Sequence, residues 1–187
     1  MGCDMTSDEN DFGTVILPFS ISLFGTSSNV ANPSTNGLLS LVSGTDSVAT
    51  NELPVSFSDP TVQAVAFPLW TDLSIFPNTT QGIYYFANST FAAFEWVLAA
   101  SCCPNLMARF AMTYDSAGAP GVVTFSYYQV WDDGGTATVG VQGSQAGPAV
   151  TVDYDGTVAV PAGTIVVCDT NVGSCTNSTF SCPGGSC

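Results

Sequence analysis

The stretch TFAAFEWVLA, residues 90–99, places large apolar side chains at every second position. In an extended chain, Phe94, Trp96 and Leu98 therefore lie on one face, and Glu95 lies on the other. A two-residue period of this kind is typical of a strand that buries one face against a core. The stretch predicts a strand that buries one face in the core and forms a hairpin with the preceding GIYYFA stretch.

Similar stretches recur along the whole chain. GTVILPFSISLFG begins at residue 13, and the Asn36-Gly37 turn signal precedes a second apolar run. The further stretches are VQAVAFPLW, GIYYFA, NLMARFAMTYD, GVVTFSYYQVW, TATVGVQG and AVTVDYDGTVAVPAGTIVV. The chain contains 18 Gly and 11 Pro, and no helical period is sustained. The pattern predicts an all-β fold of about ten strands, an antiparallel β-sandwich or jelly roll.

The length and composition favour one domain with two short additions. Of the 187 residues, 45% are hydrophobic, which is enough for a single core. We expect a polar N-terminal arm at residues 1–12, a sandwich at 13–167 and a disulfide-rich tail at 168–187. The tail has too few large apolar residues to form a core of its own.

The charge excludes several classes of function. The chain has 15 acidic residues, no His and a single basic residue, Arg109, which gives a formal charge of -14. Nucleic-acid binding requires Lys and Arg to neutralise phosphates, so it is excluded as a partner class. Catalytic sites that need His are excluded too. The chain also has no apolar run long enough to span a membrane. We expect a protein that is not an enzyme.

The seven cysteines point to an oxidising compartment. Zinc binding is the alternative, but the chain lacks CxxC spacing and His, so disulfides are favoured. The adjacent Cys102 and Cys103 have no activating cation close by, and we expect them to pair with distant cysteines of the arm or the tail. An odd number leaves one thiol, which is free or links a neighbouring chain. The predicted disulfide cysteines are Cys3, Cys102, Cys103, Cys168, Cys175, Cys182 and Cys187.

Three N-x-[ST] sequons, at Asn78, Asn88 and Asn177, are predicted glycosylation sites and agree with secretion. The first ten residues lack the basic and apolar regions of a signal peptide, so we expect a mature chain.

The stretch FPLWTDL, residues 67–73, raises the question of a functional site. Asp72 and Glu95 are the carboxylates set in strongly apolar motifs, and a glycosidase would need two such groups across a cleft. Trp70, Tyr84 and Tyr85 would then form a ligand face with Asp72. The alternative, which we favour, places Trp70 in the core and Asp72 at a strand end.

Pairs of acidic residues suggest calcium as an alternative reading. They lie at Asp132-Asp133 and at Asp153-Asp155, where DYDG resembles a fragment of a calcium loop. Both sequences are also common turns, and we expect no metal and no cofactor.

The order of the motifs LPF…FG, STNG, FPLWTDL, GIYY, FEW and TVGVQG resembles an extracellular β-sandwich module of secreted fungal and bacterial surface proteins. In outline, it is similar to the nidogen-type extracellular domain, over about residues 13–145. The resemblance implies a role in adhesion, in a matrix or in a cell wall, and brings no catalytic residues.

We therefore expect a secreted, N-glycosylated structural or adhesion module that binds itself or other surface proteins and forms extracellular filaments. The alternative is a carbohydrate-binding module, or a carboxylate-based glycoside hydrolase, with glycans as its partners.

Overall fold

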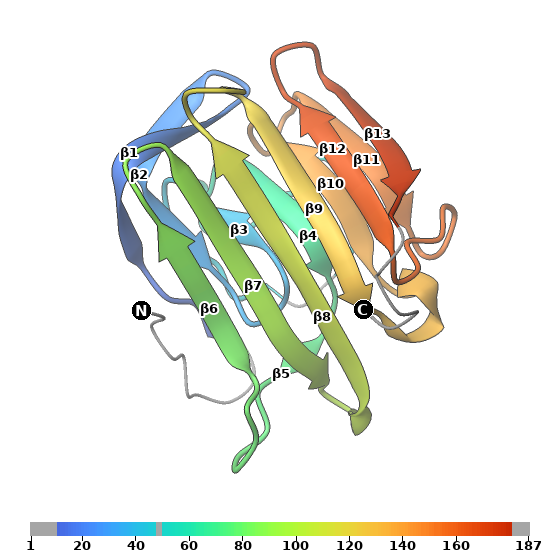
Figure 1. Ribbon diagram of the computed structural model, residues 1–187. Coiled ribbons are helices and arrows are strands. Elements are labelled where there is room, and N and C mark those ends of the chain that lie inside the picture. Colours follow the sequence, from blue (N-terminus) through green and yellow to red (C-terminus); the bar gives the residue numbers. More distant parts are fainter. Residues whose placement is uncertain (1–10, 48–49, 181–187) are drawn as a thin grey trace.

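The computed structural model describes residues 11–47 and 50–180 and contains two antiparallel sheets packed face to face (Figure 1). The six-stranded sheet has the order β1 (Val15–Leu23), β2 (Thr26–Pro33), β3 (Leu39–Ser40), β4 (Val65–Trp70), β10 (Thr138–Gln142) and β11 (Ala149–Tyr154). The seven-stranded sheet has the order β13 (Ser174–Thr179), β12 (Thr164–Asp169), β9 (Val122–Gln129), β8 (Cys103–Asp115), β7 (Phe91–Ala100) and β5 (Leu73–Ser74). The seventh strand of this sheet, β6 (Gly82–Ala87), also pairs with β7. A short 3-10 helix, η1 (Trp131–Gly134), follows β9. The predicted all-β sandwich is confirmed, with thirteen strands instead of about ten.

The main core lies between the sheets and is centred on the hairpin of β7 and β8. Trp96 and Phe94 on β7 pair with Phe110 and Met112 on β8, and all four side chains are buried. The rings of Trp96 and Phe110 stack with their centroids 5.2 Å apart. The alternation visible in the sequence is therefore the alternation of the buried face.

Three side-chain hydrogen bonds connect the two sheets through this core. The Trp96 indole N–H donates to the carbonyl of Ser34, and the Tyr127 hydroxyl donates to the carbonyl of Pro68. The Tyr114 hydroxyl accepts the backbone N–H of Ser22. Burial raises the pKa of Tyr127 well above its usual value, and the charge of Asp153 adds to the shift. These bonds satisfy polar groups that the core would otherwise leave unpaired.

A second, smaller core covers the outer side of β4. Phe67 and Trp70 pack there with residues of the chain that precedes β4, including Val55 and Phe57. Leu69, between them, joins the main core instead. The apolar run of residues 65–70 is thus buried on both sides of its sheet, which explains why it lacks a simple alternation.

The turn at Asn36 and Gly37 fixes the end of β4. The carbonyls of Gly37 and Asn36 accept the N–H groups of Leu69 and Thr71, and the Asn36 side chain accepts the N–H of Leu73. Asn36 is fully buried. A turn that the sequence marks only as a chain reversal therefore supplies hydrogen bonds to the backbone on both sides of Asp72.

The seven-stranded sheet continues beyond residue 167. Residue 168 lies inside β12, and β13 extends the seven-stranded sheet to Thr179, so the sandwich includes most of the segment that we expected to be a separate tail. The Cys168 and Cys175 side chains form a disulfide between β12 and β13. Backbone pairing compensates for the scarcity of large apolar residues in β13. Cys3, Cys182 and Cys187 lie outside the described residues.

Candidate functional site

Asp72 lies in the short connection between β4 and β5, where it is held by the turn between β7 and β8. Its carbonyl accepts the N–H of Ser101, and its carboxylate accepts the Ser101 hydroxyl at 2.6 Å. The hydroxyls of Ser101 and Ser74 are also 2.6 Å apart. The Asp72 side chain is exposed, so the position is both fixed and accessible.

Asp72 lines an open pocket of about 350 Å³, which we call the Asp72 pocket. Three chain segments meet there: the β4–β5 connection, the β7–β8 turn and η1, which lie at the same end of the sandwich (Figure 1). Its lining includes Thr71, Asp72, Cys102, Leu106, Trp131 and Thr136.

The Asp72 pocket offers one carboxylate, a thiol, the hydroxyl-bearing side chains of Thr50, Thr71 and Thr136, and part of an indole ring. The hydroxyls of Thr71 and Thr136 are 3.4 Å apart. This set can accept and donate hydrogen bonds to a polar ligand and can stack a ring on Trp131. It provides no second carboxylate, which acid–base hydrolysis of a glycoside needs.

The second carboxylate considered in the sequence, Glu95, has a different partner. Its Oε1 atom lies 2.7 Å from Nε of Arg109, and the guanidinium lies 5.3 Å from the ring centroid of Tyr128. Glu95 therefore neutralises the only basic residue of the chain on the outer face of the seven-stranded sheet. The two carboxylates do not share a pocket.

The expected ligand face does not form as one surface. The Trp70 side chain is only 1% exposed, and its indole N–H donates to the carbonyl of Ser47. Tyr85 packs against the main core, while the hydroxyl of Tyr84 donates to the carbonyl of Thr80 beside a different hollow. Of the four residues proposed from sequence, only Asp72 lines the pocket described above. The interpretation of Trp70 as a core residue agrees with its burial.

The three sequon asparagines are all exposed. Asn78 lies in the loop between β5 and β6, and Asn177 lies on β13. Asn88 forms the tip of the β6–β7 hairpin, where its side-chain oxygen accepts the N–H groups of Thr90 and Phe91. The geometry leaves each amide accessible to a glycan, and glycosylation stays a prediction.

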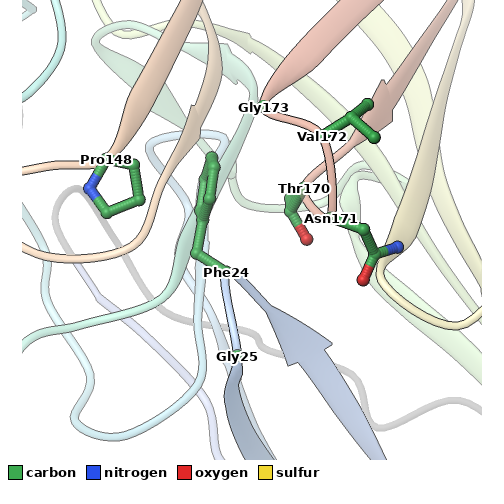
Figure 2. Close-up of a pocket in the computed structure, with 7 residues that line it drawn as sticks. All are labelled: Phe24, Gly25, Pro148, Thr170, Asn171, Val172 and Gly173. Carbon is green, nitrogen blue, oxygen red and sulfur yellow. The ribbon is translucent and has the colours of Figure 1, made fainter.

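A second open pocket, of about 510 Å³, lies at the opposite end of the sandwich. Figure 2 shows the Phe24 ring between Pro148 and Thr170, with Val172 directed away from it. Phe24 occupies the left-handed region, with φ of 49°, which is rare for a bulky residue in a hairpin turn. The side chains around this pocket bring no ionised group to it.

The acidic pairs considered for calcium do not converge. Asp132 and Asp133 are exposed in η1, whereas Asp153 is buried and accepts the N–H of Val158. Within residues 11–47 and 50–180, no group of three or more acidic, Cys or His side chains has an arrangement that could hold a metal ion.

The chain matches the profile of the family described as "NIDO related" over residues 2–180. The chain belongs to the NIDO-related family. Comparison with curated proteins gave no match, and comparison with solved structures gave none.

Membership in the NIDO-related family identifies the chain as an extracellular module, as the motif order implied. In the part of the chain that the structure describes, no helix has the length and apolar character required to cross a membrane.

Sequence reasoning singled out Asp72 and Cys102 in this NIDO-related chain but missed Trp131 and Thr136, which also line the pocket, and Ser101, which holds Asp72. Ser101, Trp131 and Thr136 lie 29 to 64 positions further along the chain. No local sequence pattern predicts that these residues lie near Asp72, because their proximity depends on which strand ends are neighbours in the fold. The sequence marked Asn36 only as a turn residue, and nothing in the sequence indicated its buried hydrogen bonds.

Proposed function

We propose that this NIDO-related module is not an enzyme and acts as a structural and adhesive unit outside the cell. Copies of the module would join through the two edge strands of the seven-stranded sheet. The observation that supports this proposal is the open edge of β13. This strand ends the sheet, and none of the other strands in residues 11–47 and 50–180 pairs with its outer side.

The sequence of β13, SCTNST, lacks the features that usually protect an edge strand. Natural edges carry Lys, Pro, bulges or inward-pointing charges that prevent further pairing. β1, at one edge of the other sheet, contains Pro18 and an irregular register between Ile16 and Ile21. β13 has neither, and the disulfide between Cys168 and Cys175 holds it against β12.

At the opposite edge of the same sheet, β6 provides the complementary strand. β6 has six residues, as β13 has, and contains no charged side chain. Pairing of β13 in one copy with β6 in the next would continue the sheet across molecules. Such a head-to-tail contact builds a filament when the rotation between successive copies does not close a ring. A glycan on Asn177, which lies on β13, would hinder the pairing.

The first prediction concerns association in solution. Unglycosylated full-length protein is expected to form larger species as its concentration rises, measured by sedimentation velocity at physiological salt. The Thr176→Lys variant places a charge on the β13 edge and is expected to weaken association at least about tenfold. Ser58→Lys, an exposed loop position, adds the same charge elsewhere and serves as the matched control.

Reductant separates the two means by which copies could join. Species that persist in reductant are held by strand pairing, and those that disappear are held by an intermolecular disulfide. A monomer at every concentration, with and without reductant, would exclude self-assembly. Equal weakening by Ser58→Lys would exclude the β13 edge.

The Asp72 pocket favours one alternative, carbohydrate binding, because a carboxylate and the Trp131 indole line the same hollow. If this is the function, the wild-type protein binds glycans on an array, and Asp72→Asn weakens binding about tenfold or more. The asparagine oxygen can still accept the Ser101 hydroxyl, so the variant is expected to fold. Absence of glycan binding by the wild type, or unchanged binding by the variant, would remove this alternative.

A further inference from the structure

The adjacent cysteines at the start of β8 are in contact with each other. The Sγ atoms of Cys102 and Cys103 lie 2.6 Å apart. The other two cysteines in the described residues, Cys168 and Cys175, are already joined to each other between β12 and β13. Among these four, each thiol of the adjacent pair therefore has only its neighbour as a partner. The pairing with distant cysteines that the sequence suggested is not present between described residues.

The backbone holds this pair in place before any bond forms. Ser101 and Cys102 form the turn of the β7–β8 hairpin, and Ala100 pairs with Cys103. Ser101 is fixed by two hydrogen bonds to Asp72, one from its N–H and one from its hydroxyl. Little conformational entropy is left to lose when the two sulfur atoms bond, because the turn is already ordered.

The surroundings favour a disulfide couple over a nucleophilic thiol. The only guanidinium of the chain, Arg109, is bound to Glu95. The hydrogen-bonded contact with Cys102 raises the pKa of the Cys103 thiol, and burial adds to the shift. A thiol with a raised pKa is a poor nucleophile at neutral pH. Cys102 is exposed and lines the Asp72 pocket, so a small oxidant can reach the pair.

We propose that Cys102 and Cys103 form a disulfide with each other, which closes a redox-sensitive ring on the rim of the Asp72 pocket. The oxidant is a small-molecule disulfide. The thiolate of the exposed Cys102 attacks it, forms a mixed disulfide and releases one small thiolate, which takes up a proton. The Cys103 thiolate, which lies beside it, then attacks the Cys102 sulfur and displaces the second small thiol. In total, two protein thiols lose their hydrogens, one S–S bond forms, and one external disulfide becomes two thiols.

Peptide mapping tests the bond directly. The full-length protein is equilibrated with oxidised glutathione, alkylated without reductant and cleaved with chymotrypsin, which cuts near Leu98 and Leu106. The expected peptide with Cys102 and Cys103 is two hydrogen atoms lighter than the dithiol and carries no alkyl group. Alkylation of both residues, or a cross-link from either one to Cys3, Cys182 or Cys187, would overturn the proposal.

Graded reduction gives a second test, with the other disulfide as an internal control. Cys168 is fully buried, whereas Cys102 is exposed. In a series of glutathione ratios, the 102–103 bond is expected to open under conditions about tenfold less reducing than those needed for the 168–175 bond, because exposed bonds are the labile ones. If the two bonds open together, the pair is not a redox-sensitive element.

Tryptophan fluorescence connects the bond to the pocket. Trp131 lines the Asp72 pocket together with Cys102, while Trp70 and Trp96 are buried. Opening of the 102–103 bond is expected to change the emission of Trp131, and the change should vanish in Trp131→Phe and in the double variant Cys102→Ser, Cys103→Ser. The same change in the double variant would assign the signal to the other disulfide and contradict an effect on the pocket.

Discussion

Gly37→Ala is expected to be among the most destabilising single substitutions in this protein. Gly37 has φ of +75°, and a Cβ atom there would lie 2.0 Å from the backbone oxygen of Leu69. The left-handed conformation alone costs alanine about 1–2 kcal/mol. The overlap with backbone adds about 1–3 kcal/mol, because neither the turn nor β4 can move without breaking the hydrogen bond between them.

Gly25→Ala is the matched control for Gly37→Ala. Gly25 has φ of +81°, but nothing lies within 4 Å of the position of its Cβ. Both variants therefore pay the backbone strain, and only Gly37→Ala adds the overlap. Urea unfolding, followed by the emission of the buried tryptophans, should give a clearly lower midpoint for Gly37→Ala. Equal midpoints would show that β4 and the turn adjust freely.

Trp70→Ala is expected to reduce the free energy of unfolding by about 3–5 kcal/mol, the usual cost of removing a large buried aromatic side chain. Trp70 is 1% exposed, and its ring centroid lies 5.2 Å from that of Phe67 and 6.2 Å from that of Phe57. The substitution also leaves the carbonyl of Ser47 without the indole donor. The segment of residues 53–62, which covers β4, should then pack less tightly on the second core.

Limited proteolysis and chemical unfolding together check the Trp70 prediction. Cleavage is expected to accelerate between residues 50 and 62, because that segment packs on Trp70. Trp131→Ala is the control, since Trp131 is only partly buried, in the Asp72 pocket, and its loss should cost much less stability. A stable Trp70→Ala protein with unchanged cleavage would mean that Trp70 is not part of the architecture.

The sequence predicts the strands of the main core well, because each shows its period locally. The residues 94, 96 and 98 on β7 and their partners on β8 carry that signal without help from the rest of the fold. β4 was readable as a strand for another reason, since an unbroken apolar run can be buried on both sides. β3 and β5 have only two residues each, which is too short for any period.

The site was less accessible to sequence reasoning, because its parts meet only in the folded chain. Asp72 was singled out for its apolar surroundings, and its exposure in a pocket is consistent with either a strand end or a ligand contact. Which cysteines pair with each other depends on the order of the strands in the sheet. Cys168 and Cys175 meet because β12 and β13 are neighbours, and no spacing rule specifies that. The pairing of β13 with β12 was not visible in the sequence, because backbone hydrogen bonds, instead of buried apolar side chains, hold β13.

The chain has 15 acidic residues and one basic residue, which is a formal charge of -14, and that one basic side chain is bound to Glu95. Dissolved cations must take the place of the missing lysines, because self-repulsion of this size opposes a compact state and falls only as salt shortens its range. The ionic strength of the solution therefore affects both the stability of this protein and its association. At low ionic strength, repulsion among its own carboxylates destabilises the fold, and copies of the protein repel one another. At higher ionic strength, both repulsions weaken.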